Sequence, residues 1–205
     1  MKTRLPALLV LTTTAVVAGC GSAKQARSTP ATTAPPATTQ TTPASTSPGA
    51  LQAEAASAAT GDIPDNQVYL AFHSKAGWSI KYPEGWAQSG GLNATVFRDK
   101  NNIVRIVIHP GAAPTMAQVR SDASLRKARI TSAPKAMSIK GARAIKVVYS
   151  TQSAPNAVTG KRVTLTVDRY YLAGAGKVAT IDLGTPVGVD NVDAYRLMVE
   201  SFRWR

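Results

Sequence analysis

Two short patterns in the chain bring together residue types that can do chemistry. Ser124 and Lys127 have the S-x-x-K spacing that places a nucleophilic hydroxyl and its base on consecutive turns of a helix, but neither S-D-N nor K-T-G follows. Residues 174–177 (GAGK) resemble a phosphate-binding loop, yet the four-residue spacing and the Ser or Thr after the lysine are missing. The first pattern is therefore attributed to chance, and the second is expected to form a hairpin turn.

The histidines and carboxylates are too scattered to suggest catalysis or metal binding. His73 and His109 each lie near a predicted strand end, and neither has a second His or a Cys at ligand spacing. Asp190 and Asp193 stand at the start of a predicted helix, where the positive end of the helix dipole favours them. The sequence therefore predicts no catalytic residues, no metal site and no cofactor.

The one cysteine of the chain stands where a lipid-attachment signal needs a thiol. Cys20 follows Val17-Ala18-Gly19 and an apolar run that is shorter than the ~20 residues needed to span a bilayer. This pattern resembles the bacterial lipoprotein signal, which implies cleavage between Gly19 and Cys20 and a diacylglyceryl thioether on Cys20. The alternative is an ordinary signal peptide in which Cys20 is incidental.

Composition divides the chain into three parts. Residues 1–19 are the expected signal peptide, and residues 20–64 are expected to form a disordered tether rich in Ser, Thr, Pro and Ala. Between residues 28 and 48 this tether has no aromatic or large aliphatic side chain, so it cannot bury enough surface to fold. It serves either as a stalk through a cell-wall layer or as a plain linker. Residues 65–205 remain for one folded domain, which has no disulfide if Cys20 is lipidated.

The folded part carries most of the net positive charge. The chain has 24 Lys and Arg against 11 Asp and Glu, a formal charge of +13, and 20 of the basic and 9 of the acidic residues lie from Asp65 onward. Such a balance favours phospholipid headgroups, phosphate-bearing wall polymers or acidic protein surfaces as partners. Nucleic acid is not expected, because the chain carries an export signal and no reader motif. The alternative is a solvated basic surface without a partner.

Hydrophobic spacing predicts the elements that position these residues. Apolar side chains alternate with period two over most of the folded part, with turns at residues 83–85, 100–102, 140–141 and 174–176. The spacing changes to that of a weakly amphipathic helix over residues 114–127 and again over a C-terminal helix capped by Asn191 or Asp190. We expect an α+β fold, an antiparallel sheet of about six to eight strands covered by an internal and a C-terminal helix. The predicted strands are residues 68–72, 78–82, 95–98, 103–109, 129–139, 142–151, 162–172 and 177–183.

The two ends of this domain resemble a known family. Residues 72–86 (FHSKAGWSIKYPEGW) are similar to the opening hairpin of the PsbP-like superfamily, and residues 192–204 (VDAYRLMVESFRW) are similar to its terminal helix, which closes on Ser-Phe. The resemblance implies an αβα sandwich around a central antiparallel sheet. Its members include an extrinsic photosystem II subunit and the LpqN-type lipoproteins of high-GC Gram-positive bacteria. The lipid signal and the tether of this chain match the LpqN-type lipoproteins best. No motif for the metal sites of the photosystem subunit is present.

Aromatic and basic side chains provide a candidate binding surface. The aromatic residues of the opening hairpin are expected to serve as core and lid or to edge a groove, and four basic residues on strands could form one sheet face. This candidate surface comprises Trp78, Tyr82, Trp86, Arg105, Lys146, Arg162 and Arg169.

The sequence thus predicts a monomeric, non-enzymatic binding or accessory module. Its lipidated Cys20 would anchor it to the extracytoplasmic face of the cell membrane, and its basic surface would dock an acidic envelope protein or an anionic polymer. Two alternatives remain. The first is a carrier or sensor of a small apolar or lipid ligand, which requires a cavity. The second is a hydrolase, which requires a Ser, a His and an Asp to converge in space.

Overall fold

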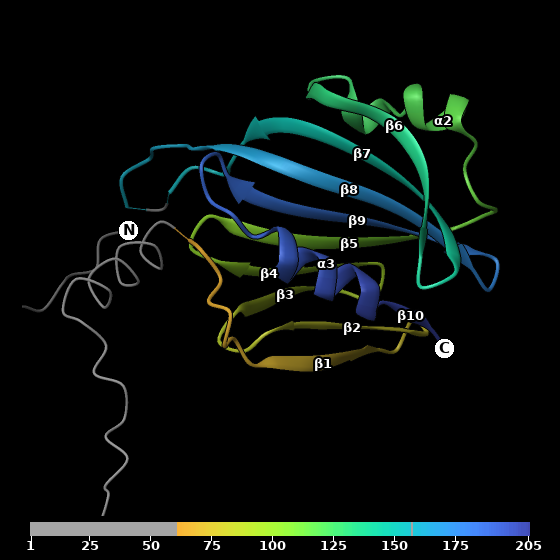
Figure 1. Cartoon of the computed structure of the whole chain (residues 1–205), viewed down its shortest axis with the longest axis horizontal. Helices are drawn as coiled ribbons and strands as arrows, with labels where there is room; N and C mark the ends of the chain where they lie inside the picture. Colours follow the sequence, from red (N-terminus) through yellow and green to blue (C-terminus); the bar gives the residue numbers. More distant parts are fainter. Residues whose placement is uncertain (1–60, 157) are drawn as a thin grey trace, which may run out of the picture. The chain divides into compact units, whose positions relative to one another are not determined.

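A computed structural model of the chain describes residues 61–156 and 158–205 (Figure 1). Its central feature is a seven-stranded antiparallel sheet with the strand order β3-β4-β5-β9-β8-β7-β6. The α+β class and the expected range of strand number are therefore confirmed. The seven strands are β3 (Ala87–Gly91), β4 (Ala94–Asp99), β5 (Asn102–Pro110), β6 (Arg129–Ile139), β7 (Ala142–Gln152), β8 (Thr164–Gly174) and β9 (Lys177–Pro186).

Three tight turns set the register of this sheet. Asp99 pairs with Asn102, Ile139 with Ala142, and Gly174 with Lys177, so each turn contains two residues. In the second and third turns both central residues have positive φ, which is the two-residue geometry that matches the twist of antiparallel strands. The GAGK segment is therefore a hairpin turn, as its sequence predicted.

The opening hairpin lies in a second sheet. Strand β2 (Trp78–Pro83) pairs with β1 (Tyr69–Ser74) on one side and with β10 (Arg203–Trp204) on the other. The hairpin itself is as predicted, but its strands do not pair with a strand of the central sheet, and Lys177 of β9 donates a side-chain hydrogen bond to the Ala76 carbonyl in its turn at 2.8 Å. Strands β3 and β10 were not predicted, because the residues AQSGG lack β-forming side chains and β10 has only two residues.

Within residues 61–156 and 158–205, two helices and one 3-10 turn complete the fold. The predicted helix over 114–127 is shorter: α2 spans Met116–Arg120, and the 3-10 turn η1 follows at Ala123–Leu125. The side chains of Ser121 and Asp122 bond to nearby backbone, a local alternative that ends the helix. The C-terminal helix α3 spans Val192–Ser201, as expected. No helix in the described ranges is long and apolar enough to cross a membrane.

The two faces of the central sheet bury separate cores. Ile106 of β5 and Ile181 of β9 lie directly opposite each other and pack with Met198 of α3 and with the three-stranded sheet. We call this side the α3 face. On the other side Val147 of β7 packs with Val119 of α2, and we call it the α2 face. Figure 1 shows α2 beside β6, at the edge of the sheet away from β1 and β2.

The folded part already includes residues ahead of Asp65, where the sequence places its start. The Gly61 carbonyl accepts hydrogen bonds from the side-chain amides of Asn102 (2.5 Å) and Asn191 (3.2 Å). The Asn191 oxygen in turn accepts from the amide of Ile63 at 2.8 Å. The side chain of Asn191 is therefore used to hold the start of the domain and makes no capping hydrogen bond to α3.

Candidate functional site

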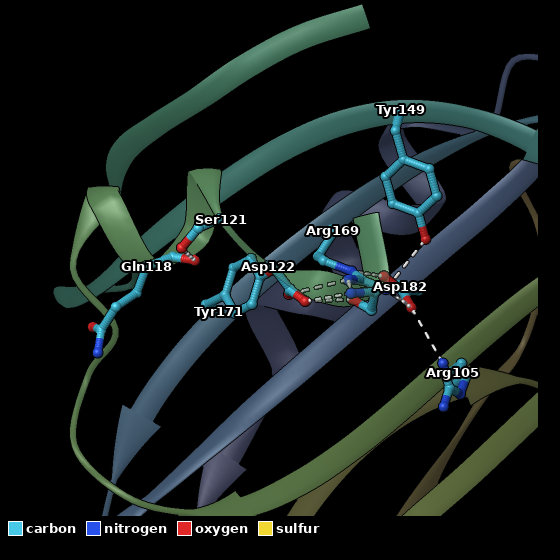
Figure 2. Close-up of polar contacts among 9 residues, drawn as sticks. Arg105, Gln118, Ser121, Asp122, Tyr149, Arg169, Tyr171 and Asp182 are labelled. Atoms are coloured by element: carbon cyan, nitrogen blue, oxygen red, sulfur yellow. Dashed lines mark hydrogen bonds and ion pairs between the residues drawn. The ribbon is translucent and has the colours of Figure 1, made fainter. Parts of the chain in front are cut away.

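A buried ion pair lies at the middle of the α2 face. Arg169 of β8 is directly opposite Asp182 of β9, and their side chains are 4% and 6% exposed. The guanidinium donates two hydrogen bonds to the carboxylate, from Nε to Oδ1 at 2.5 Å and from Nη2 to Oδ2 at 2.8 Å. Arg105 of β5 stands on the other side of Asp182, with Nη1 at 3.9 Å from Oδ2. The three residues form one cross-strand row (Figure 2).

The same arginine connects the sheet to the segment that covers it. Nη1 of Arg169 donates to Ser124 Oγ at 2.5 Å and lies 3.5 Å from Asp122 Oδ2. Tyr171 donates its hydroxyl proton to the same Asp122 oxygen at 2.6 Å. Asp122 also accepts from the Ser124 amide at 2.8 Å, and this bond begins η1. Arg169 therefore holds the loop between α2 and η1 against β8.

The electrostatics of this cluster suit a structural role. Burial acts to raise the pKa of Asp122, but hydrogen bonds from Tyr171 and Ser124 and the charge of Arg169 lower it overall. Burial, reinforced by Asp182, raises the pKa of Tyr149 to about 12. Burial alone would lower the pKa of Arg169, yet its bonds to Asp182 raise it. None of these groups has a pKa moved toward neutrality, where general acid–base catalysis works best.

Two apolar hollows open at the ends of α2. The first has a volume of about 450 Å³ and lies between the C-terminal end of α2, η1, β6 and β7, and we call it the α2 hollow. The second, of about 540 Å³, lies at the N-terminal end of α2. Val147 lines the first and Ile145, two residues earlier on β7, lines the second, so both open on the α2 face. The lining of the α2 hollow is mainly apolar and includes Val119, Leu125, Ile130, Ala133, Pro134 and Val147.

Exposed cations surround this end of the molecule. Arg120 and Arg126 line the α2 hollow, and three more basic side chains follow on the way into β6 and along it. None of the five forms an ion pair with another described residue, and the nearby carboxylate of Asp122 is bound to Arg169. We call these five residues the basic ridge: Arg120, Arg126, Lys127, Arg129 and Lys135. The ridge is not confined to the α2 face, because Arg129 and Lys135 pair with Ser150 and Lys146 of β7, whose side chains alternate with that of Val147.

A third hollow, of about 840 Å³, lies between α3 and the outer face of β1 and β2. Four cations (Lys81, Lys140, Arg196 and Arg203) line it together with His73 and three carboxylates, so its charge is mixed. Two of those carboxylates are already paired, Glu200 with Lys140 at 3.5 Å and Asp193 with Arg196 at 3.0 Å. This hollow therefore offers less charge complementarity to an anion than the basic ridge does.

The aromatic residues predicted as a binding surface lie mainly in the core. Trp78 has no exposed surface and stacks on Phe202, with ring centroids 5.9 Å apart. Trp86 is 8% exposed, and half-buried Tyr82 stacks on Phe97 at 4.3 Å. Trp78 and Tyr82 face inward because alternate residues of β2 point toward the α3 face, and Trp86 follows the turn after β2 and packs in the same core.

The four predicted basic residues do not form one surface. Arg169 and Arg105 belong to the row on Asp182, but Arg169 is buried and only Arg105 reaches solvent. Lys146 lies on the opposite face of the sheet, 2.6 Å from Asp168. Arg162 donates to the Ser153 carbonyl at 2.7 Å, outside the regular strands. Exposed cations are spread over the domain, and the basic ridge is the group of them that lies next to the α2 hollow in sequence and space.

In the part of the chain that the structure describes, Ser, His and Asp side chains do not converge into a catalytic triad. Ser124 lies beside Asp122 and Arg169, with no histidine near it, and no bond links it to Lys127. His73 and His109 are exposed on β1 and β5 and form no hydrogen bond with a described side chain. No cluster of three or more His, Cys, Asp or Glu side chains in residues 61–156 and 158–205 could hold a metal ion. Gly19 and Cys20 lie outside the described residues.

Sequence reasoning missed Asp182, Asp122, the basic ridge and the hollows. One signal was available for the ion pair, since Arg169 interrupts the apolar face that Val167 and Tyr171 define on β8. An arginine among inward-facing residues needs a buried partner. The partner itself depends on which strand lies beside β8, and one sequence does not contain that information. The ridge was visible as the run RKAR at residues 126–129.

No protein-family model and no curated protein matches the chain. Solved structures similar to it include the following two. The solution structure of cyanobacterial PsbP (CyanoP) from Synechocystis sp. PCC 6803 shares 17% identity and a TM-score of 0.49 over 71% of this chain and 98% of that chain. A crystal structure from Bacteroides thetaiotaomicron VPI-5482 shares 14% identity and a TM-score of 0.46 over 66% of this chain. The chain spans about half (48%) of the Bacteroides structure.

Proposed function

We propose that this chain is an exported, PsbP-like lipoprotein of the LpqN type that works as a non-enzymatic binding module. In this proposal the lipid on Cys20 holds it at the extracytoplasmic face of the cell membrane, and residues 20–64 set its reach. The folded domain then docks an acidic envelope protein or an anionic polymer through the basic ridge. The lipid-signal pattern before Cys20 supports the anchor.

The observation that carries the docking proposal is the basic ridge. Its cations are exposed and have no carboxylate partner among the described residues, so their field extends into solvent. The other cations that the sequence singled out are different, because Arg169 and Lys146 are neutralised by Asp182 and Asp168. An anionic partner therefore meets cations without an ion-pair partner in the described residues along α2, η1 and β6.

In-cell crosslinking of the tagged full-length chain tests this proposal. The ridge variant Lys127→Glu/Arg129→Glu is compared with Lys75→Glu/Lys161→Glu, which makes the same change in net charge at exposed sites outside the ridge. We expect the crosslinked partner, recovered at low salt, to be lost in the ridge variant and kept in the control. Equal recovery from the two variants would overturn the assignment to the ridge.

The anchor is tested separately with the variant Cys20→Ser. This variant is expected to leave the membrane fraction, and its retention there would overturn the anchor.

A further inference from the structure

The α2 hollow has the dimensions and lining of a small-molecule site. Its volume of about 450 Å³ falls within the range of about 300–1,000 Å³ that ligand pockets occupy. Ile130 of the lining is 45% exposed and Ala133 is exposed as well, whereas Val119 and Val147, each 1% exposed, are almost fully covered by other side chains. An apolar side chain this exposed to solvent, beside other apolar residues that line a hollow, marks a place where an apolar group of a ligand can be buried.

The charged residues that line the hollow indicate which polar head group such a ligand should carry. Arg120 and Arg126 both line it, and both are exposed and without an ion-pair partner in the described chain. Asp122 also lines the hollow, but its carboxylate is satisfied by Tyr171, Ser124 and Arg169 and therefore does not repel an anion strongly. A guanidinium that meets a carboxylate or phosphate forms charge-assisted hydrogen bonds.

We propose that the α2 hollow binds one anionic amphiphile, with its acyl chain against Ile130, Ala133 and Pro134 and its acidic head at Arg120 and Arg126. A volume of about 450 Å³ has room for a single chain. This inference rests on the proposed function, since Arg120 and Arg126 belong to the basic ridge. It goes further by naming the class of ligand and the cavity that takes it.

Fluorescence titration with dansyl-labelled undecanoic acid, kept below its micelle concentration, tests the proposal on the full-length chain with Cys20→Ser. That substitution prevents an acyl group on Cys20 from occupying the hollow. The filling variant Ala133→Trp is compared with Ala136→Trp, a matched exposed alanine on β6 that lines the second hollow instead. We expect saturable binding that Ala133→Trp weakens at least roughly tenfold and Ala136→Trp leaves unchanged. Unchanged binding in Ala133→Trp, or loss only in Ala136→Trp, would overturn the site.

Competition measurements test the head group. Decanoate is expected to displace the probe better than decanol, and Arg120→Gln/Arg126→Gln should reduce that preference roughly tenfold. Equal displacement by the acid and the alcohol would overturn the anionic class. Binding that appears only on phosphatidylglycerol vesicles, and not with the monomeric probe, would show a membrane surface rather than a single ligand and would overturn the inference. Because Ala133→Trp leaves the ridge charge intact, its effect is separate from a failure of the docking proposal.

Discussion

The α3 face of the central sheet is covered by a ten-residue helix and a second sheet, whereas the α2 face is covered by a five-residue helix and one 3-10 turn. The first face is lined with aromatic rings, among them Trp78, Phe97 and Phe202, and the pairs stack or pack edge to face. The second contains a buried ion pair, two apolar hollows and, at the first hollow, Arg120 and Arg126, which form no ion pair with another described residue. The complete cover buries aromatic surface and stabilises the fold, while the partial cover leaves charge and space for a ligand.

Removing the largest ring from the α3 face should have the largest effect on stability. Trp78 is fully buried, so Trp78→Ala removes apolar contacts and leaves a cavity, with an expected loss of about 3–5 kcal/mol in the free energy of unfolding. Urea unfolding of the full-length chain measures this loss. A change of less than about 1 kcal/mol would show that this face contributes little to stability and would break the comparison.

Removing only one partner of the ion pair on the α2 face should lower the free energy of unfolding more than removing both partners. Asp182→Leu leaves Arg169 buried beside Asp122 alone, and we expect a loss of about 3 kcal/mol. The double variant Arg169→Met/Asp182→Leu removes both charges and should recover most of that loss. A double-mutant cycle by urea unfolding checks both values. If the two single losses simply added, Arg169 and Asp182 would not be coupled in the way that their two hydrogen bonds indicate.

The smallest expected effect is the dependence of stability on pH through Asp122. Its pKa is lower in the folded state than in the unfolded chain, where a carboxyl titrates near about 3.9. Its contribution is therefore fully present above about pH 4 and is lost as the pH falls through the folded value. Asp122→Asn should be less stable than the parent at pH 6, and the difference should shrink toward pH 2 in urea unfolding series. A difference that grew with acidity would contradict this sign.

The strands were predictable because their evidence is local. Alternating side chains and turn residues such as Lys140-Gly141 lie next to each other in the chain, and β4, β5, β7 and β8 formed close to where they were expected. The α2 face was not predictable from the same evidence. Whether Arg169 reaches solvent depends on β9 beside it and on η1 above it, and both contacts join residues distant in sequence. The role of Asn191 was not predictable for the same reason, since its side chain is hydrogen-bonded to the backbone of Gly61 and Ile63 and does not cap its own helix.

The last residues of the chain complete the sheet that the first strands begin. β10 pairs with β2 across almost the whole domain sequence, the Arg205 amide donates to the Gly77 carbonyl at 2.9 Å, and the Trp204 ring lies so close to Gly174 that a Cβ there would approach it to 2.2 Å. During synthesis, β1 and β2 are therefore made early but lack their third strand until residue 205 has been added. Contacts of such long separation form slowly, because the intervening chain must first be ordered. A chain made only as far as β9 cannot complete this sheet, so its third strand is added only after β10 has been synthesised.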